Sequence, residues 1–320
     1  MVTRVDTAQG VHPCTRNLRT GAPRMFGSTF RQLKIHSTLY VMMIPVIAYF
    51  AVFVYYPLYE GVVASFQEFN LLGARPYIGW ENYTTAWNDP PFWQVVRNTL
   101  LIGGGTLIVG FLPPIIVALS LNELRLILFK KFTQTVVYLP HLFSWVVIGG
   151  IWIYVLSPRG GLVNEFLALI DVGPVRFLTD TTWARILMIV LPVWKEMGFA
   201  AIIYLASIAS ISPTLYEAAR IDGASRFQQI YQITVPLLIP TMKVVLMLNV
   251  LGLLRIFDQI YVLRNGVVQR KIDVIMTYVY DTGIQQYEVG YASAISVMVL
   301  VATLVLTAIV WRVTGFGREN

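Results

Sequence analysis

The sequence predicts an all-α integral membrane protein with six transmembrane helices. Three observations lead to this: a composition too apolar for a soluble protein, six long apolar segments, and a biased distribution of basic residues. Of 320 residues, 56% are hydrophobic and 13% are charged, whereas a soluble domain of this length carries roughly a quarter charged residues. Mean hydropathy is +0.64. Much of the surface must therefore face lipid.

Six segments meet the length requirement for a membrane span, which is about twenty mostly apolar residues. They lie within a transmembrane domain that we place at residues 35–320, after a polar, basic N-terminal tail at residues 1–34. We expect the spans at about Thr38–Leu58, Val95–Leu121, Phe132–Leu156, Trp183–Ser207, Leu237–Tyr261 and Tyr287–Val313.

The distribution of lysine and arginine predicts the orientation of these spans, because basic residues are enriched on the cytoplasmic side. With the N-terminus inside, thirteen basic residues fall in inside segments and six in outside loops. Both termini are therefore expected in the cytoplasm.

The sequence gives no signal for several kinds of binding site. The net charge of +7 comes from residues scattered among apolar segments and not from one basic face, so nucleic acid is not an expected partner. The single Cys14 cannot form an intrachain disulfide and is either incidental or a lipidation site. His12, His36 and His141 are too widely spaced to suggest a metal site. Gly103–Gly105 lacks the lysine of a phosphate-binding loop, and these glycines instead favour close helix packing.

The inside loop at residues 208–236 is predicted to fold. Ser212 suits an N-cap and Pro213 the first helical position, and residues 217–220 favour a helix. Gly223 suits the left-handed conformation that ends a helix.

A second helix is predicted directly after this glycine. Ser225 followed by Gln228 has the form of a capping box, and we expect the helix that it starts to end before Pro236. The loop thus reads as helix, glycine hinge, helix.

The same residues resemble the EAA motif of binding-protein-dependent ABC importer permeases. Glu217-Ala218-Ala219, Gly223, Ile233 and Pro236 hold the family spacing, and Val235 stands where leucine is usual. Leu215-Tyr216 before the tripeptide and Ile221-Asp222-Gly223-Ala224 after it resemble the carbohydrate branch in particular. The resemblance implies the fold of a type I, MetI-like permease and a place in the inner membrane of a bacterial cell.

In that family this segment is the coupling helix, which docks on an ATP-binding subunit. The resemblance assigns this role to Glu217, Ala218, Ala219, Asp222, Gly223 and Ala224, and we call residues 213–224 the coupling segment. A short stiff helix transmits a rigid-body displacement. A plain amphipathic helix at the membrane interface is the alternative.

Other residues resemble a permease subgroup for polysaccharides and complex oligosaccharides, including alginate importers. They are Tyr138–Val147, Asn122–Arg125, Asp273-Val274 and Thr277–Tyr280. Together the resemblances cover most of the chain from about Arg31 onward.

Candidate pathway residues lie on the fourth and fifth spans, which flank the coupling segment. Ionisable residues within spans are costly and often functional, and the sugar site of maltose-type relatives is on the same two helices, although not all of their polar site residues are retained. The candidates are Trp194, Lys195, Glu196, Gly198, Asn249, Gly252, Leu253, Arg255, Ile256 and Asp258.

Trp194 suits stacking on a sugar ring, and Lys195 and Arg255 suit a uronate carboxylate, which favours an acidic saccharide. A structural role is the alternative: Lys195 and Glu196 pair with each other or with a second permease, and Lys243 and Arg255 reach toward the interfaces.

The sequence therefore predicts a transport subunit and not an enzyme. The resemblance implies a second, homologous permease, two ATP-binding subunits that carry ATP and Mg²⁺, and an extracytoplasmic binding protein. A membrane enzyme acting on lipid-linked saccharides is the main rival, but we find no clustered carboxylates or histidines at a membrane face. A channel, the third possibility, lacks an evident filter segment.

Overall fold

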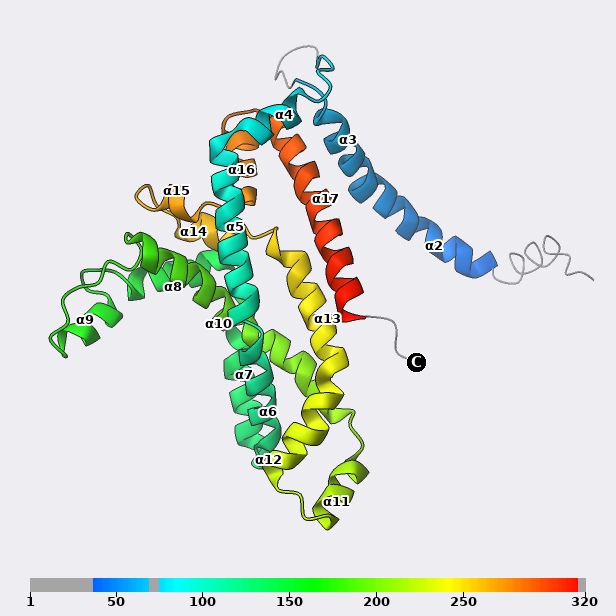
Figure 1. Cartoon of the computed structure of the whole chain (residues 1–320), viewed down its shortest axis with the longest axis vertical. Coiled ribbons are helices and arrows are strands. Elements are labelled where there is room, and N and C mark those ends of the chain that lie inside the picture. The colour runs from blue at the N-terminus through cyan, green and yellow to red at the C-terminus, as the bar shows by residue number, and fades with distance from the viewer. Residues whose placement is uncertain (1–36, 69–74, 316–320) are drawn as a thin grey trace, which may run out of the picture. The chain divides into compact units, whose positions relative to one another are not determined.

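The computed structural model describes residues 37–68 and 75–315, and these residues are almost wholly helical (Figure 1). The predicted tail at residues 1–34 lies outside the described residues. Within them, an isolated bridge between Gln67 and Tyr77 is the one extended pairing. The helices, with π-helical turns labelled η, are α2 (Ser37–Phe50), η1 (Ala51–Tyr55), α3 (Tyr56–Ala64), α4 (Glu81–Asn88), α5 (Pro90–Val109), α6 (Leu112–Glu123), α7 (Ile127–Leu142), α8 (Trp145–Val155), α9 (Leu162–Ala168), α10 (Thr181–Ala209), α11 (Pro213–Ile221), α12 (Arg226–Gln229), η2 (Ile230–Thr234), α13 (Val235–Leu253), α14 (Asp258–Leu263), α15 (Gln269–Ile272), α16 (Ile275–Tyr280), η3 (Asp281–Gln285) and α17 (Val289–Thr314).

Five helices of the described residues are long and apolar enough to cross a membrane, and a bent pair makes a sixth candidate when its two helices are counted as one span. The chain divides into two compact units, residues 1–58 and 59–320, and the first described helix, Thr38–Ala64, begins in the first unit. The spans that lie in the second unit are Pro90–Glu123, the bent pair α7 and α8, Thr181–Ala209, Arg226–Leu253 and Val289–Thr314. The prediction of an all-α membrane protein is confirmed.

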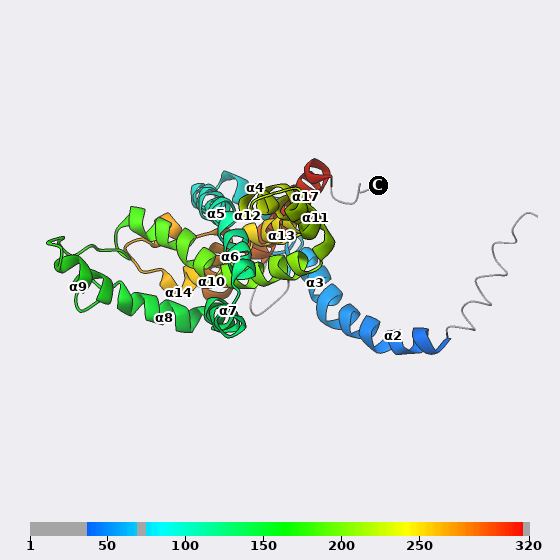
Figure 2. The same cartoon turned by 90° about the horizontal axis from the view of Figure 1, so that it is seen from below.

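The third predicted span is a bent pair of helices and not one straight helix. The axes of α7 and α8 meet at 100°. Pro140 removes a backbone donor from the last turn of α7, and Phe143 and Ser144 are both extended. The Ser144 hydroxyl then accepts a hydrogen bond from the Val147 amide at 3.4 Å and starts α8. Figures 1 and 2 both show α8 and α9 projecting away from α5, α6 and α13.

The fifth predicted span also differs from the structure at both ends. The predicted second helix of the inside loop does not end before Pro236; it continues through η2 into α13, so one helix runs from Arg226 to Leu253. In η2 the Val235 amide bonds to the Ile230 carbonyl, and Pro236, which has no backbone donor, follows directly after this π-helical turn. At the other end α13 stops at Leu253, directly after Gly252, and α14 starts only at Asp258.

The helices of the second unit pack around α10 and α13. Helix α10 contacts α5, α6 and α7, and α13 contacts α5, α10 and α17. In lipid, close approach and van der Waals contact hold helices together, and small residues favour both. A Cβ added at Gly103 would lie 2.7 Å from the Leu253 carbonyl oxygen, and one at Gly105 would lie 2.6 Å from Ile189 Cδ1. These two glycines confirm the predicted close packing.

Candidate functional site

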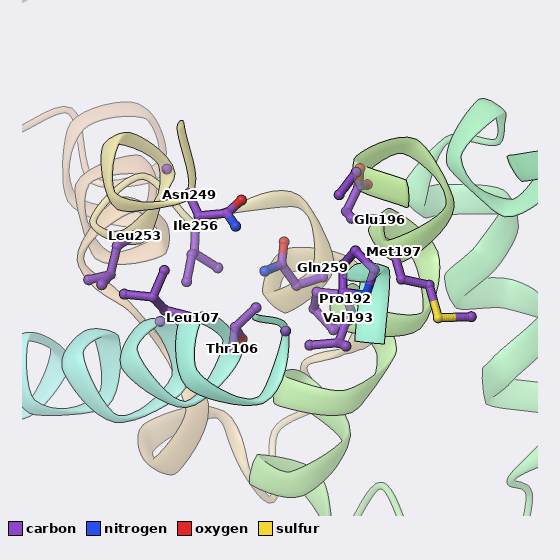
Figure 3. A pocket seen from close by; sticks show the side chains of 15 residues that line it. Thr106, Leu107, Pro192, Val193, Glu196, Met197, Asn249, Leu253, Ile256 and Gln259 are labelled. Atoms are coloured by element: carbon purple, nitrogen blue, oxygen red, sulfur yellow. The ribbon is translucent and has the colours of Figure 1, made fainter. Parts of the chain in front are cut away.

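A small cavity lies between α5, α6, α10 and the turn that joins α13 to α14 (Figure 3). Its volume is about 140 Å³. Helices α10 and α13 supply opposite parts of its wall, so a relative movement of these two helices would change its size. The lining residues are Gly103, Thr106, Leu107, Gly110, Pro114, Pro192, Val193, Glu196, Met197, Ala200, Asn249, Gly252, Leu253, Ile256 and Gln259.

Four polar side chains face a largely apolar wall: Thr106, Glu196, Asn249 and Gln259. In Figure 3 the amides of Asn249 and Gln259 point into the same space. The Thr106 hydroxyl is buried and has no hydrogen-bond partner among the described residues. Amides and a hydroxyl both donate and accept hydrogen bonds, as sugar hydroxyls require.

Glu196 is held in place from outside the cavity. Its Oε2 lies 2.6 Å from Nδ1 of His141, and its Oε1 accepts from Nζ of Lys195 at 2.9 Å. The His141 ring stacks on Phe199 with centroids 4.6 Å apart. The wall of the cavity therefore carries a carboxylate fixed by two neighbours.

The Lys195 ammonium is held by partners within the protein. Its side chain is 7% exposed, its ammonium also donates to the His141 carbonyl at 3.2 Å, and it lies 5.5 Å from the Trp145 ring centroid. Buried charges require such partners. The sequence alternative in which Lys195 and Glu196 pair with each other is the one that the structure contains.

The predicted pathway residues fall into two groups. Five of them line the cavity: Glu196, Asn249, Gly252, Leu253 and Ile256. The remaining five, Trp194, Lys195, Gly198, Arg255 and Asp258, are not among the lining residues.

Helix periodicity and the end of α13 explain where this second group lies. The Trp194 ring packs edge-on against Trp152, with centroids 5.5 Å apart. A Cβ on Gly198 would overlap the Val137 carbonyl, so this glycine allows α10 to approach α7. Arg255 and Phe257 line a separate groove with Tyr280 of α16, and Asp258 is exposed.

Sequence reasoning missed the contributions of α5, α6 and α14 to the cavity, including Thr106 and Gln259. Thr106 follows the Gly103–Gly105 run, and that run was a usable signal because it predicts close approach of another helix. Gln259 had no such signal, because its position depends on the break after Leu253.

An ion-pair network fixes this break. The Arg264 guanidinium donates to both oxygens of Asp281 at 2.6 and 2.8 Å and lies 3.4 Å from Oδ1 of Asp273. The hydrogen bonds to Asp281 raise the pKa of Arg264, and burial raises the pKa of Asp273. A bidentate pair of this kind is rigid. It ties α14, which carries Gln259, to η3.

The coupling segment forms the predicted helix and turn. Gly223 has φ = +79°, as predicted for a helix stop. The Ala224 amide bonds to the Ala219 carbonyl at 2.8 Å and the Gly223 amide to the Arg220 carbonyl at 3.1 Å, which is a Schellman motif. The predicted capping box is also present, since Ser225 and Gln228 exchange hydrogen bonds of 3.3 and 2.7 Å.

The structure corrects one detail of the first cap. Ser212 occupies the N-cap position of α11, but its side chain makes no capping hydrogen bond. Its hydroxyl lies 2.8 Å from the Thr214 hydroxyl, which competes with the backbone amides for it.

The outer face of the coupling segment is exposed. Glu217, Ala218 and Asp222 are exposed, while Ala219 and Ala224 are half-buried. The Ile221 side chain is 87% exposed. Within the second unit, Figure 1 places α11 at the opposite end from α4 and the start of α17. The segment therefore presents both apolar and polar side chains at its surface.

Comparison with known proteins agrees with this arrangement. Residues 114–313 match the family model described as "Binding-protein-dependent transport system inner membrane component". The permease protein YteP of a polygalacturonan/rhamnogalacturonan transport system in Bacillus subtilis is 36% identical over 288 residues, which cover 88% of this chain and 89% of YteP. The arabinooligosaccharide permease AraP of the same organism is 31% identical, over 86% of this chain and 88% of AraP.

Two solved structures share the fold. A chain of the crystal structure of a bacterial alginate ABC transporter, in complex with an alginate pentasaccharide-bound periplasmic protein, has a TM-score of 0.81 and 36% identity, and the match covers 88% of this chain and 95% of that one. A chain of the crystal structure of an ABC transporter involved in import of the acidic polysaccharide alginate has a TM-score of 0.84 and 35% identity, over 91% and 100%.

The family match covers well over half of the chain, and the apolar helices agree with it. The chain belongs to the binding-protein-dependent transport system inner membrane components: it is a multi-pass permease subunit of an ABC importer in the inner membrane, and not an enzyme.

Proposed function

We propose that this chain forms half of the pathway through which an oligo- or polysaccharide rich in uronic acid crosses the inner membrane, and that its coupling segment transmits movement from ATP-binding subunits. One observation carries the proposal. The two helices that form opposite parts of the cavity wall, α10 and α13, are the two that the coupling segment joins. A displacement of that segment therefore reaches both sides of the cavity.

The size of the cavity supports a second permease subunit. Ligand pockets usually measure about 300–1,000 Å³, and this one measures about 140 Å³. One chain thus offers a partial site. A homologous permease that supplies the facing wall, in an arrangement with two ATP-binding subunits, would enlarge it.

The chemistry of the cavity supports a saccharide. Asn249, Gln259 and Thr106 offer hydrogen bonds within an apolar wall, and a few placed polar groups in an apolar pocket fix ligand orientation. The cavity does not itself carry a free cation for a uronate, since Lys195 is paired with Glu196. The proposal of an acidic substrate rests on the similarity to polygalacturonan and alginate transport proteins.

The exposed face of the coupling segment supports docking on an ATP-binding subunit. Ile221 offers an apolar contact and Glu217 a carboxylate, and the Schellman turn after Ile221 gives the segment a fixed shape. ATP and Mg²⁺ would be bound by the partner subunits, and an extracytoplasmic binding protein would deliver the solute. Hydrolysis would then alternate the access of the cavity between the two sides of the membrane.

The distribution of basic residues supports placing both termini and the coupling segment in the cytoplasm. Reporter fusions at the end of α9 and after Thr314 give opposite signals under this topology.

Reconstitution tests the function. The complex, with its partner subunits and binding protein in proteoliposomes, should hydrolyse ATP faster when a uronate oligosaccharide is present and should accumulate that sugar. A neutral oligosaccharide of equal length is the control for charge. A cysteine at Ile221 should form a disulfide with a cysteine placed on the ATP-binding subunit, whereas a cysteine at Leu128, exposed at the start of α7, should not. Absence of sugar-dependent ATP hydrolysis with every saccharide would reject the proposal.

A further inference from the structure

The base of α13 is the weak point between the coupling segment and the cavity. A π-helical turn interrupts the regular hydrogen bonds at residues 230–234, and Pro236 and Pro240 each lack a backbone donor. Such interruptions are where helices bend. A displacement of α11 would be lost in bending at this base unless another contact bridges it.

One hydrogen bond from α11 bridges the π-helical turn of this base. The Tyr216 hydroxyl, on the inward face of α11, lies 2.9 Å from Oγ1 of Thr234, the last residue of η2. Thr234 is 3% exposed, and its hydroxyl also approaches the Gln229 carbonyl at 3.4 Å. A hydroxyl has one proton. If Thr234 donates to Gln229, the Tyr216 hydroxyl is the donor to Thr234.

The chain between these two residues is itself braced. The buried Gln229 side chain donates to the Ala224 carbonyl at 3.0 Å, and the capping box at Ser225 fixes the start of α12. The Schellman motif fixes the end of α11. The hydrogen bond between Tyr216 and Thr234 thus connects the two ends of a segment whose turns are each held by their own hydrogen bonds.

A nine-residue helix such as α11 is not stable alone in water, since isolated helices shorter than about 12–15 residues are marginal. Its inward contacts must therefore hold it in place. Among these, the bond to Thr234 is directed and reaches the transmembrane helix itself.

We propose that Tyr216 and Thr234 form a coupling clasp that makes the coupling segment and α13 move as one body, so that ATP hydrolysis is converted into transport. Both are positioning residues that touch neither solute nor nucleotide. The inference rests on the proposed function, because it assumes that α11 receives the movement.

The test measures the number of ATP molecules hydrolysed per sugar transported by the reconstituted complex. Tyr216→Phe removes only the hydroxyl, Thr234→Val keeps the shape of threonine, and Thr234→Ser keeps the hydroxyl. Tyr231→Phe, at a 68% exposed tyrosine one helical turn before Thr234, is the matched control.

We expect Y216F and T234V each to raise the ATP-to-sugar ratio by about 3- to 10-fold, the range in equilibrium that a single hydrogen bond supplies. The double variant should be no worse than the worse single variant, because both remove one bond. T234S and Y231F should match the unsubstituted complex. A merely structural loss would lower both activities together and leave the ratio unchanged.

An unchanged ratio in an assembled Y216F complex overturns the clasp, and so do additive effects in the double variant. If T234V does not assemble, Y216F decides alone, since it removes one half-buried atom. Failure of the proposed function is a separate result: the unsubstituted complex would then show no sugar-dependent ATP hydrolysis at all.

Discussion

Gly198 separates a packing role from a pathway role, and a single methyl group tests the difference. In Gly198→Ala the added carbon would overlap the Val137 carbonyl oxygen and lie 2.7 Å from the Val137 carbonyl carbon and 3.0 Å from Tyr138 Cα. All three are backbone atoms of α7, so no side-chain rotation relieves the clash. Carbon atoms prefer separations of about 3.5–4.0 Å, so α7 and α10 must move apart by about 1 Å. Overpacking of this kind costs about 1–3 kcal/mol.

A matched variant isolates that cost. Gly104 also lies inside a helix, but a Cβ there meets nothing within 4 Å. Both substitutions gain the same helix propensity, about 1 kcal/mol, so their difference contains the clash alone. With about 2–4 °C per kcal/mol for a chain of this size, we expect G198A to melt about 2–12 °C below G104A.

The assay is thermal unfolding of the purified complex in detergent, accompanied by sugar-dependent ATP hydrolysis measured well below the melting temperature. Equal melting temperatures for the two variants would refute the packing argument. An unchanged melting temperature together with a loss of transport would instead place Gly198 on the solute path.

Three further predictions follow from the same geometry. Gly252 lines the cavity, and a Cβ there would meet open space. Gly252→Leu should therefore reduce sugar transport at least severalfold, while the melting temperature of the complex stays within a few degrees. A normal transport rate contradicts the assigned pathway. Arg264→Met leaves the partly buried Asp281 and Asp273 without their cation, so it should lower the stability of the complex in thermal unfolding by about 2–4 kcal/mol. Arg264→Lys keeps the charge but loses the bidentate geometry, so its stability should lie between those of the unsubstituted complex and Arg264→Met. Equal stability of the unsubstituted complex and both variants contradicts the network. Gly223 has φ = +79°, and the left-handed conformation costs an alanine about 1–2 kcal/mol and a β-branched residue more. Sugar-stimulated ATP hydrolysis should therefore decline in the order Gly, Asn, Ala, Val at this position. Activities that do not follow this order show that the turn is not needed.

The sequence predicted most of the fold because lipid imposes simple rules. Length and apolarity located the five long helices and the bent pair that can cross a membrane, and turn chemistry located Gly223 and the Ser225 cap. The bend between α7 and α8 has a local signal in Pro140, but its angle of 100° does not follow from the sequence. The break after Leu253 is irregular backbone inside an apolar run, where hydropathy carries no signal. Backbone of this kind is tolerated at membrane depth only when protein buries it or when it lines a cavity, so it is decided by tertiary contacts.

The sequence predicted five of the residues that line the cavity, and tertiary contacts decide the others. Position along α10 and α13 identified Asn249, Leu253 and Ile256 through the family resemblance. Which neighbours turn inward depends on helix rotation and on the end of α13. Arg255 was therefore assigned to the pathway although it does not line the cavity, and Gln259, which does, was missed. The ionic residues were informative in a different way: Lys195 marks the site by fixing Glu196 and not by meeting the solute.

The two cavity helices differ in what lies between each of them and the coupling segment. On α10, no proline or π-turn lies between Glu196 and the end of the helix at Ala209, so under the proposed function this wall would follow a displacement of the segment directly. On α13, a π-turn and two prolines lie between the segment and Asn249, and the clasp of Tyr216 with Thr234 spans the first of them. Beyond both prolines, the Ser207 hydroxyl of α10 lies 2.7 Å from the Thr241 hydroxyl of α13, so α13 would receive movement from α10 as well as through the clasp. Weakening the clasp should therefore reduce how far α13 follows the coupling segment without disconnecting it, and more ATP would be hydrolysed for each sugar transported.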